Sequence, residues 1–292
     1  MTEQVPVGRA FSPRHLQGQA ARLARRKAAP YVLLLAIALP VAVHAQRAGG
    51  PPPAAREAAA IDLTGYWVSV ITEDWKYRMV TPRKGVFDAL PLNPEARKVG
   101  NAWDPARDEA AGEQCKAYGA AGLMRMPTRL NITWQDANTL RIQTDAGTQT
   151  RVFRFTTTGP SAASVRGADR LASAALSGRI SRPDLAKADE PSWQGLSIAQ
   201  WEYAPGAARM GSLKVMTTNL RPGYVRRNGA PYSERAVMTE HYDVNTLPNG
   251  ERWMTITTRV EDPMYFTRPY ITTSDFKQLP DAAGWNPTPC SP

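Results

Sequence analysis

Residues 129–155, RLNITWQDANTLRIQTDAGTQTRVFRF, contain three short β-rich runs that are separated by turn residues. In the first run Leu130, Ile132 and Trp134 alternate with polar residues, and the second run, TLRIQT, has the same period. A period of two is typical of a strand with one buried face. The joints QDAN and DAGT carry the residues that tight turns favour. This stretch therefore predicts three consecutive antiparallel strands.

The same texture continues on both sides of this stretch. No long amphipathic helices alternate with the runs, which disfavours a parallel α/β sheet. An antiparallel sheet that closes on itself leaves no exposed edge. We therefore predict an all-β fold, an antiparallel up-and-down barrel of about 8–10 strands. The further runs are 65–72, 76–80, 196–203, 212–219, 236–243, 252–260 and 270–276.

Two short helices are predicted just before Cys115, over residues 94–102 and 105–113. Asn93 and Asp104 are residue types that cap helices, and each is followed by a proline, which favours the first helical position.

The remaining segments set the domain boundaries. Residues 46–60, QRAGGPPPAAREAAA, show no apolar period and are expected to be a disordered tether. Residues 156–192 are rich in Ser, Ala, Gly and Pro and are expected to be a long surface insertion. No internal repeat is visible, so one β domain over 61–292 is the simplest division.

The net charge argues against a nucleic-acid partner. The chain has 36 basic and 26 acidic residues, a formal charge of +10. Residues 1–45 hold six of the basic residues and one acid, which leaves 30 against 25, or +5, for the rest. A charge this small, spread along the chain, is not typical of nucleic-acid binding.

The N-terminal segment has the features of a signal peptide. A basic cluster, Arg22 to Lys27, precedes the apolar run YVLLLAIALPVAV at 31–43, and the small residues of Val43-His44-Ala45 precede Gln46. A run of 13 residues is too short to cross a bilayer of about 30 Å. We expect cleavage before Gln46, no stable membrane span afterwards, and a periplasmic or secreted protein. A retained membrane anchor is the alternative.

The two cysteines, Cys115 and Cys290, are expected to form a disulfide, because an exported protein can keep one oxidised. A reactive thiol or a metal site is the alternative. The chain after residue 45 has one histidine, His241, and no Cys/His cluster at ligand spacing, so zinc and copper have little support.

Several short motifs carry a resemblance to a known family. They are Trp103-Asp104-Pro105, GEQCKAYG at 112–119, Pro127 before the strand RLNITW, VEDP at 260–263, Thr267-Arg268-Pro269 and the closing Cys290. In these motifs the chain is similar to a large set of exported bacterial proteins with lipocalin-like β-barrels. The resemblance implies a barrel whose interior could hold a small molecule, and it implies no catalytic residue.

Five residues are candidates for a site in the barrel cavity. Trp67 and Trp201 lie mid-strand and could form rigid aromatic walls around a ligand. His241 could act as a general base, with Glu202 of another strand as its partner, and Glu240 lies beside it. Because neighbours on a strand point to opposite faces, Glu240 and His241 cannot both point inward.

Two further groups of polar residues are more typical of salt bridges than of catalysis. The first follows the run at 65–72, and its adjacent carboxylates cannot form a glycosidase pair by themselves. The second consists of scattered arginines that could receive a carboxylate. The groups are Glu73, Asp74, Trp75 and Arg78, and Arg125, Arg129, Arg226 and Arg227.

The leading interpretation is an exported barrel that binds a small, partly apolar or aromatic molecule. The alternatives are a metal-independent isomerase, lyase or hydrolase that uses His241 and Glu202, or an envelope accessory protein that uses the insertion. The chain lacks a G-x-S-x-G elbow and phosphate-binding glycine loops, and no cofactor is expected. The sequence leaves the oligomeric state open.

Overall fold

A computed structural model describes residues 53–155, 190–206 and 210–291. The chain divides into two units, residues 1–48 and 49–292, and every described residue belongs to the second. The expected signal peptide and most of the expected insertion lie outside the described residues.

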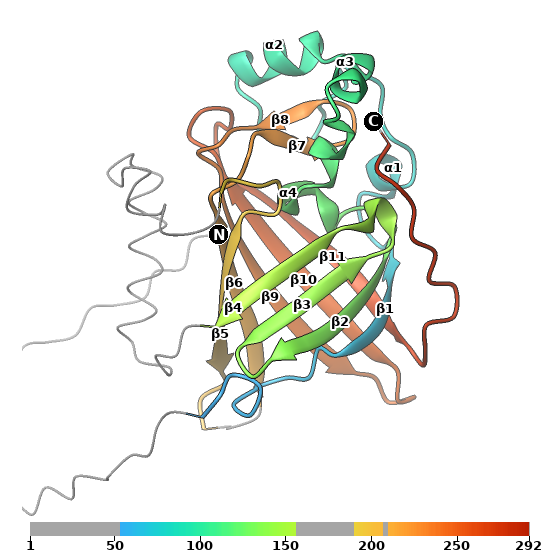
Figure 1. Ribbon diagram of the computed structural model, residues 1–292, viewed down its shortest axis with the longest axis vertical. Coiled ribbons are helices and arrows are strands. Elements are labelled where there is room, and N and C mark those ends of the chain that lie inside the picture. Colours follow the sequence, from blue (N-terminus) through green and yellow to red (C-terminus); the bar gives the residue numbers. More distant parts are fainter. Residues whose placement is uncertain (1–52, 156–189, 207–209, 292) are drawn as a thin grey trace, which may run out of the picture. The chain divides into compact units, whose positions relative to one another are not determined.

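Nine strands close into a barrel, which confirms the predicted fold class (Figure 1). The three strands predicted at residues 129–155 are present as consecutive antiparallel neighbours. Two further strands, β7 (Gly223–Arg226) and β8 (Ala230–Tyr232), form a separate hairpin. In barrel order the nine strands are β1 (Gly65–Val70), β11 (Tyr270–Leu279), β10 (Arg252–Glu261), β9 (Val237–Thr246), β6 (Gly211–Thr218), β5 (Leu196–Tyr203), β4 (Thr150–Phe155), β3 (Thr139–Thr144) and β2 (Arg129–Asp136).

The barrel is not wholly antiparallel, which corrects the sequence prediction. Strands β4 and β5 pair in parallel, with Phe153 opposite Ser197. A parallel pair needs a long crossover to bring the chain back to the starting end, whereas an antiparallel pair needs only a turn. Residues 156–195 join the two strands along the chain, a length sufficient for such a crossover.

The predicted strand at residues 76–80 is also wrong, because the chain there forms the short helix α1 (Trp75–Arg78). Arg78 is almost fully buried and forms an ion pair with Glu73. Its Nε atom also donates a hydrogen bond to the carbonyl oxygen of Arg125 at 2.9 Å. These contacts hold one helical turn in a short run whose aromatic and branched residues predicted a strand.

The helices predicted before Cys115 are α2 (Pro94–Ala102) and α3 (Pro105–Ala110). The side chains of Asn93 and Asp104 accept hydrogen bonds from main-chain N–H groups in the first turns, as their capping role predicts. Helix α3 ends before residue 113 because Gly112 adopts a left-handed conformation, with φ of 69°. Together with η1 (Gln114–Tyr118), α4 (Ala120–Leu123) and the β7–β8 hairpin, these helices lie at one end of the barrel and form the cap (Figure 1).

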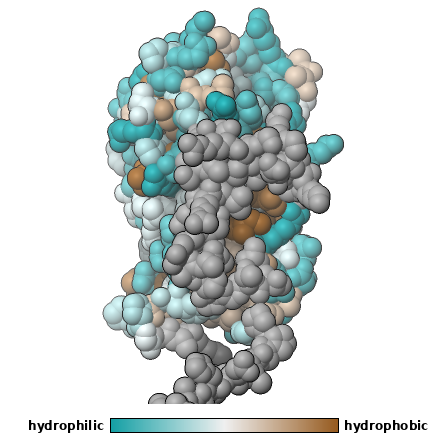
Figure 2. All heavy atoms as spheres, turned by 90° about the vertical axis from the view of Figure 1, so that its left-hand side faces the viewer, coloured by the Kyte–Doolittle hydropathy of each residue, from teal (hydrophilic) through white to brown (hydrophobic). Residues whose placement is uncertain are grey.

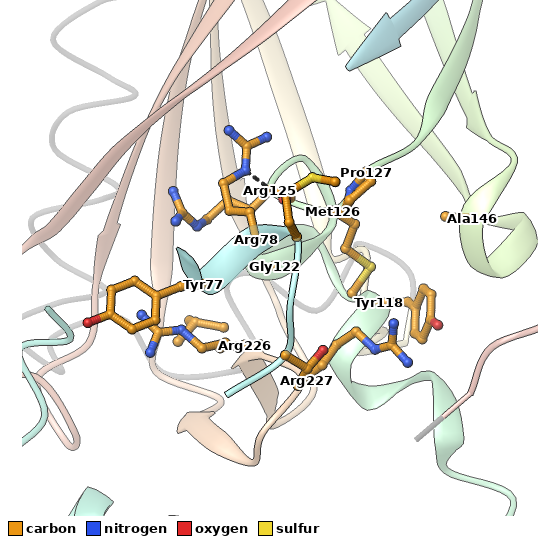
Figure 3. A pocket seen from close by; sticks show the side chains of 13 residues that line it. Tyr77, Arg78, Tyr118, Gly122, Arg125, Met126, Pro127, Ala146, Arg226 and Arg227 are labelled. Atoms are coloured by element: carbon orange, nitrogen blue, oxygen red, sulfur yellow. Dashed lines mark hydrogen bonds between the residues drawn. The ribbon is translucent and has the colours of Figure 1, made fainter. Parts of the chain in front are cut away.

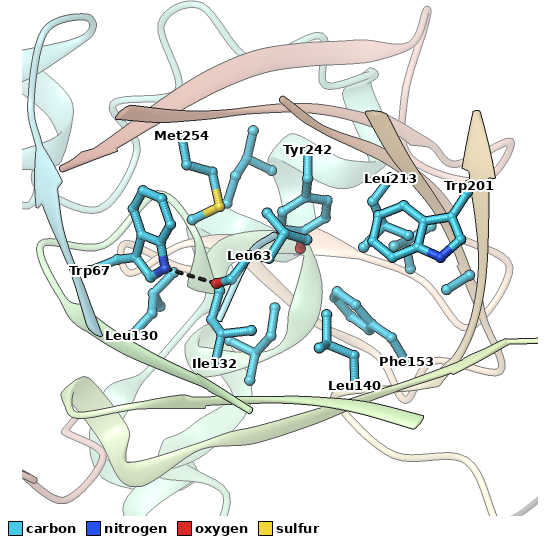
Figure 4. Close-up of a cluster of buried hydrophobic side chains, with 14 of the residues drawn as sticks. Leu63, Trp67, Leu130, Ile132, Leu140, Phe153, Trp201, Leu213, Tyr242 and Met254 are labelled. Carbon is cyan, nitrogen blue, oxygen red and sulfur yellow. Dashed lines mark hydrogen bonds between the residues drawn. The ribbon is translucent and has the colours of Figure 1, made fainter. Parts of the chain in front are cut away.

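The barrel interior is filled by its own side chains (Figure 4). Large inward residues from strands on opposite sides of the barrel meet in one buried cluster, and most are fully inaccessible to solvent. They include Trp67, Leu130, Phe153, Leu213, Tyr242 and Met254.

Residues 53–64 close the end of the barrel that lies opposite the cap. Ala55, Ala60 and Leu63 are buried in the barrel core, so the expectation of a disordered tether is wrong for residues 53–60. Leu63 lies among the core side chains in Figure 4. Three aromatic donors bond to carbonyl oxygens of this segment: Trp201 Nε1 to Ala55 at 2.8 Å, Tyr203 Oη to Ala58 at 2.6 Å, and Trp67 Nε1 to Leu63 at 2.9 Å.

The predicted disulfide between Cys115 and Cys290 is present, with Cα atoms 5.2 Å apart. It ties the C-terminal residues of the chain to η1 in the cap, and the two cysteines are 175 residues apart in sequence.

Figure 2 views the face that lies on the left in Figure 1, where the cap end is mostly hydrophilic with scattered hydrophobic residues.

Candidate functional site

His241 and Glu202 come together, but on the outer face of the barrel. His241 Nε2 lies 3.5 Å from Glu202 Oε2, and the two side chains are 38% and 37% exposed. The alternation of β9 causes this, because its inward residues are Met238, Glu240 and Tyr242, each fully buried. The expectation that His241 and Glu202 line the barrel cavity is therefore corrected.

Glu240 does lie inside the barrel, and its partner is Arg151 of β4. Arg151 donates two hydrogen bonds to the carboxylate, at 2.9 and 2.6 Å, and both side chains are fully buried. Burial alone would lower the pKa of Arg151, but the negative charge of Glu240 raises it above its usual value. The hydroxyl of Tyr242 donates to Glu240 Oε1 at 3.2 Å. The positive charge of Arg151 is neutralised by the carboxylate of Glu240, so the two residues form a buried ion pair in the core.

Trp67 and Trp201 also belong to the core. Both indoles are largely or wholly buried, and their N–H groups are satisfied by main-chain carbonyls of residues 53–64. In the described part of the barrel these five candidate residues therefore do not surround a cavity.

A pocket of about 160 Å³ lies instead where α1, α4 and β7 meet, and we call it the arginine pocket (Figure 3). Of the described residues that line it, four are arginines and none is acidic. The rest of the lining is largely aromatic and apolar. The lining includes Tyr77, Tyr118, Met126, Arg78, Arg125, Arg226 and Arg227.

Arg226 and Arg227 flank the pocket on two sides. Figure 3 shows the Arg226 side chain extending toward Tyr77 and the Arg227 side chain toward Tyr118. The guanidinium carbons lie 4.6 and 5.7 Å from the centroids of these two rings. The register of β7 against β8 shifts between Tyr224 and Arg226, and such an irregularity changes the direction of the side chains that follow it.

Arg78 and Arg125 form a second layer, with guanidinium groups that point away from Arg226 and Arg227 in Figure 3. Arg78 pairs with Glu73, and Arg125 Nη2 lies 2.8 Å from Asp74 Oδ2. The carboxylates of residues 73 and 74 are therefore salt-bridge partners, as the sequence analysis favoured.

Arg226 differs from these two arginines, because no carboxylate among the described residues lies within ion-pair distance of it. It is 8% exposed, its Nη2 donates to the main-chain oxygen of Asp88 at 3.1 Å, and its buried Nη1 has no hydrogen-bond partner among the described residues. Burial lowers the pKa of Arg226 and the positive charge of Arg125 lowers it further, while the nearby Tyr270 acts in the opposite direction and offsets part of this decrease. A negative charge that entered the pocket would relieve both effects.

The sequence analysis named Arg125, Arg226 and Arg227 as a group, and the structure brings these three together. Arg129 is not among the lining residues, since its Nη1 lies 3.7 Å from Asp145 on the barrel. Sequence reasoning missed Tyr77 and Tyr118 as lining residues. The RR pair at 226–227 marks two of the arginines in the sequence, but no local pattern marks the two tyrosines.

Comparisons of the chain with protein-family models, with curated proteins and with solved structures find no match. Within the part of the chain that the structure describes, no helix is both long and apolar enough to span a membrane. The site must therefore be interpreted from its own geometry.

Proposed function

We propose that this protein is an exported, disulfide-closed barrel that binds a small, partly apolar or aromatic molecule bearing an acidic group, in the arginine pocket. The observation that carries the proposal is the buried guanidinium group of Arg226, which has no carboxylate partner among the described residues. A buried cation without a counter-charge is costly, whereas a bound carboxylate or phosphate supplies both the charge and a hydrogen-bond acceptor.

The remaining lining fits the non-acidic part of such a ligand. The rings of Tyr77 and Tyr118 and the side chain of Met126 offer flat and apolar surfaces around the arginines. Binding sites for small molecules commonly combine mostly apolar walls with a few placed polar groups. A pocket of about 160 Å³ has room for one ring and its substituent rather than for a long chain.

Export to the periplasm or the medium is part of this proposal. The Cys115–Cys290 disulfide supports it, since such bonds persist in oxidising compartments. The resemblance to exported lipocalin-like proteins supports it as well. The lipocalin resemblance implies a ligand inside the barrel, but the barrel is filled by its own side chains, which favours the arginine pocket instead.

The alternative of an acid–base enzyme in the barrel cavity loses its geometric basis. His241 and Glu202 contact each other at 3.5 Å, but both lie on the outer face of the barrel. A general base needs a substrate held within hydrogen-bond reach, and neither His241 nor Glu202 lines the arginine pocket.

Titration calorimetry with benzoate and phenyl phosphate tests the proposal, with benzyl alcohol as the uncharged probe. We expect the two acids to bind the wild-type protein and benzyl alcohol not to bind measurably. The Arg226→Gln variant should weaken acid binding on the order of tenfold or more, because a hydrogen bond to a charged group is lost. The control is Arg107→Gln on α3, where the side chain is 85% exposed.

Equal binding of the acids by wild type and Arg226→Gln would overturn the proposal. Because Arg226→Gln could disturb the cap, its circular dichroism and unfolding transition are recorded alongside. A folded Arg226→Lys variant that retains part of the affinity separates a loss of charge from a loss of structure.

A further inference from the structure

Residues 75–86, WKYRMVTPRKGV, form an exposed surface whose apolar residues Trp75, Val80 and Val86 do not line the arginine pocket. We call these residues the basic-aromatic segment; they comprise α1 and the chain that follows it. Trp75, Met79 and Val80 are 68%, 59% and 69% exposed, and Val86 is 37% exposed. These are four of the eight large hydrophobic residues exposed in the described chain, so the exposure is concentrated rather than scattered.

The anchoring of α1 explains why these side chains face outward. Arg78 is buried against Glu73 and the carbonyl oxygen of Arg125, and Tyr77 lies against Arg226. Trp75 and Met79 are four residues apart and so share the face of the helical turn that these anchors leave outside. The contacts of Arg78 and Tyr77 thus fix the orientation of α1 and leave Trp75 and Met79 exposed to solvent.

The charge of the segment has one sign. It contains Lys76, Arg78, Arg83 and Lys84 and no acidic residue. Lys76, Arg83 and Lys84 are exposed, although Lys84 Nζ also donates to the carbonyl oxygen of Trp103. The preceding acids, Glu73 and Asp74, are occupied by Arg78 and Arg125. Asp88 follows the segment and accepts a hydrogen bond from the Tyr77 hydroxyl at 3.5 Å, so it offsets one of the three exposed positive charges. The surface therefore combines apolar side chains with a net positive charge.

We propose that the basic-aromatic segment docks the protein on the surface of an anionic lipid bilayer, with Trp75, Met79 and Val80 at the interface. Lysine and arginine are attracted to the negative surface potential, and tryptophan is favoured at the boundary between headgroups and acyl chains. A second copy of the chain fits less well, because two surfaces with the same positive charge repel each other. The docking is peripheral and does not involve a span.

This inference does not rest on the proposed function. Four residues of the segment also line the arginine pocket, namely Tyr77, Arg78, Met79 and Thr81. The exposed cations Lys76, Arg83 and Lys84 and the apolar residues Trp75 and Val80 do not. Arg226→Gln is therefore expected to bind vesicles like the wild type. The failure of one proposal leaves the other standing.

Co-sedimentation with vesicles of phosphatidylglycerol and phosphatidylcholine, against vesicles of phosphatidylcholine alone, tests the docking. We expect binding to the anionic vesicles only, and a marked decrease in binding between low and high salt. Brominated lipid should quench part of the tryptophan fluorescence in the wild type and less of it in Trp75→Phe.

Two sets of variants test the segment itself. Lys76→Gln/Arg83→Gln/Lys84→Gln and Trp75→Ala/Val80→Ser should each lower vesicle binding tenfold or more. The charge control removes three exposed arginines elsewhere, Arg56→Gln/Arg107→Gln/Arg235→Gln. The apolar control is Ile271→Ser, where the side chain is 61% exposed on β11.

The proposal is overturned if wild-type protein does not sediment with the anionic vesicles. It is also overturned if the control variants lose as much binding as the segment variants, because binding would then follow net charge alone. Retention on immobilised polyglutamate without vesicle binding would assign the segment to an acidic polypeptide instead.

Discussion

The guanidinium carbon of Arg226 lies 4.6 Å from the centre of the Tyr77 ring, and the side chain is almost buried without a carboxylate partner among the described residues. The two residues are far apart in sequence, and only the docking of α1 on the β7–β8 hairpin brings them together. The arrangement places a desolvated cation against an aromatic surface, and both are features that a small aromatic acid can use.

Ligand binding should stabilise the fold. A molecule that binds the folded state alone adds about 2.7 kcal/mol at a concentration of 100 times its Kd. We therefore expect benzoate at this concentration to raise the melting temperature of the wild type, and to raise that of Arg226→Gln by about half as much or less, because a tenfold weaker Kd leaves about 1.4 kcal/mol of stabilisation. Differential scanning calorimetry gives both values. An equal rise in the two proteins would indicate binding elsewhere.

The buried pair in the barrel should be sensitive to the loss of one partner. Glu240→Gln leaves the charge of Arg151 buried without compensation and should lower the free energy of unfolding by about 3–5 kcal/mol. Glu202→Gln, on the outer face, should change it by about 0–1 kcal/mol. Urea titrations of the two variants give the comparison. Similar losses for both would show that Glu240 and Arg151 are not charged and paired in the core.

The disulfide should contribute substantially, because it closes a loop of 175 residues. Replacing both cysteines, Cys115→Ser/Cys290→Ser, should cost about 2–5 kcal/mol of unfolding free energy. Reduction of the wild type should give a similar loss. If neither treatment shifts the urea midpoint, the attachment of the C-terminal residues to η1 does not constrain the unfolded chain.

The segment that closes the barrel should depend on its aromatic donors. Tyr203→Phe removes the hydrogen bond to Ala58 O and should cost about 0.5–1.5 kcal/mol. Hydrogen exchange in residues 54–60 should become faster in this variant. The control is Tyr66→Phe, since no hydrogen bond from the Tyr66 hydroxyl is found in the described structure. Unchanged exchange in Tyr203→Phe would mean that other contacts hold the segment.

The sequence predicted the fold best where the signals are local. Residues 129–155 combine a period of two with turn residues, so their three strands follow from neighbours along the chain. The parallel pairing of β4 with β5 is a contact across a long crossover, and no local pattern reports it. The same holds for α1, where the buried contacts of Arg78 hold a helical turn in a run whose composition predicted a strand.

The sites show the same limit. Arg151 shares its strand face with Phe153 and Phe155, so the period of β4 could have placed it in the core. The arginine pocket is different, because Tyr77 on α1, Arg125 just after α4 and Arg226 on β7 are far apart in sequence and meet only in the folded protein. The sequence alone identified three of its arginines as candidate binding residues, but it gave no signal for Tyr77 and Tyr118.

The central claim is that Arg226 receives the acidic group of a small molecule. The most direct test follows the ¹⁵Nε–H resonance of the Arg226 side chain by nuclear magnetic resonance during a benzoate titration, with the signal assigned by its absence in Arg226→Gln. The account predicts a saturable shift of this resonance, while that of the exposed Arg107 stays in place. An Arg226 resonance that does not move, or moves no more than that of Arg107, would contradict the account.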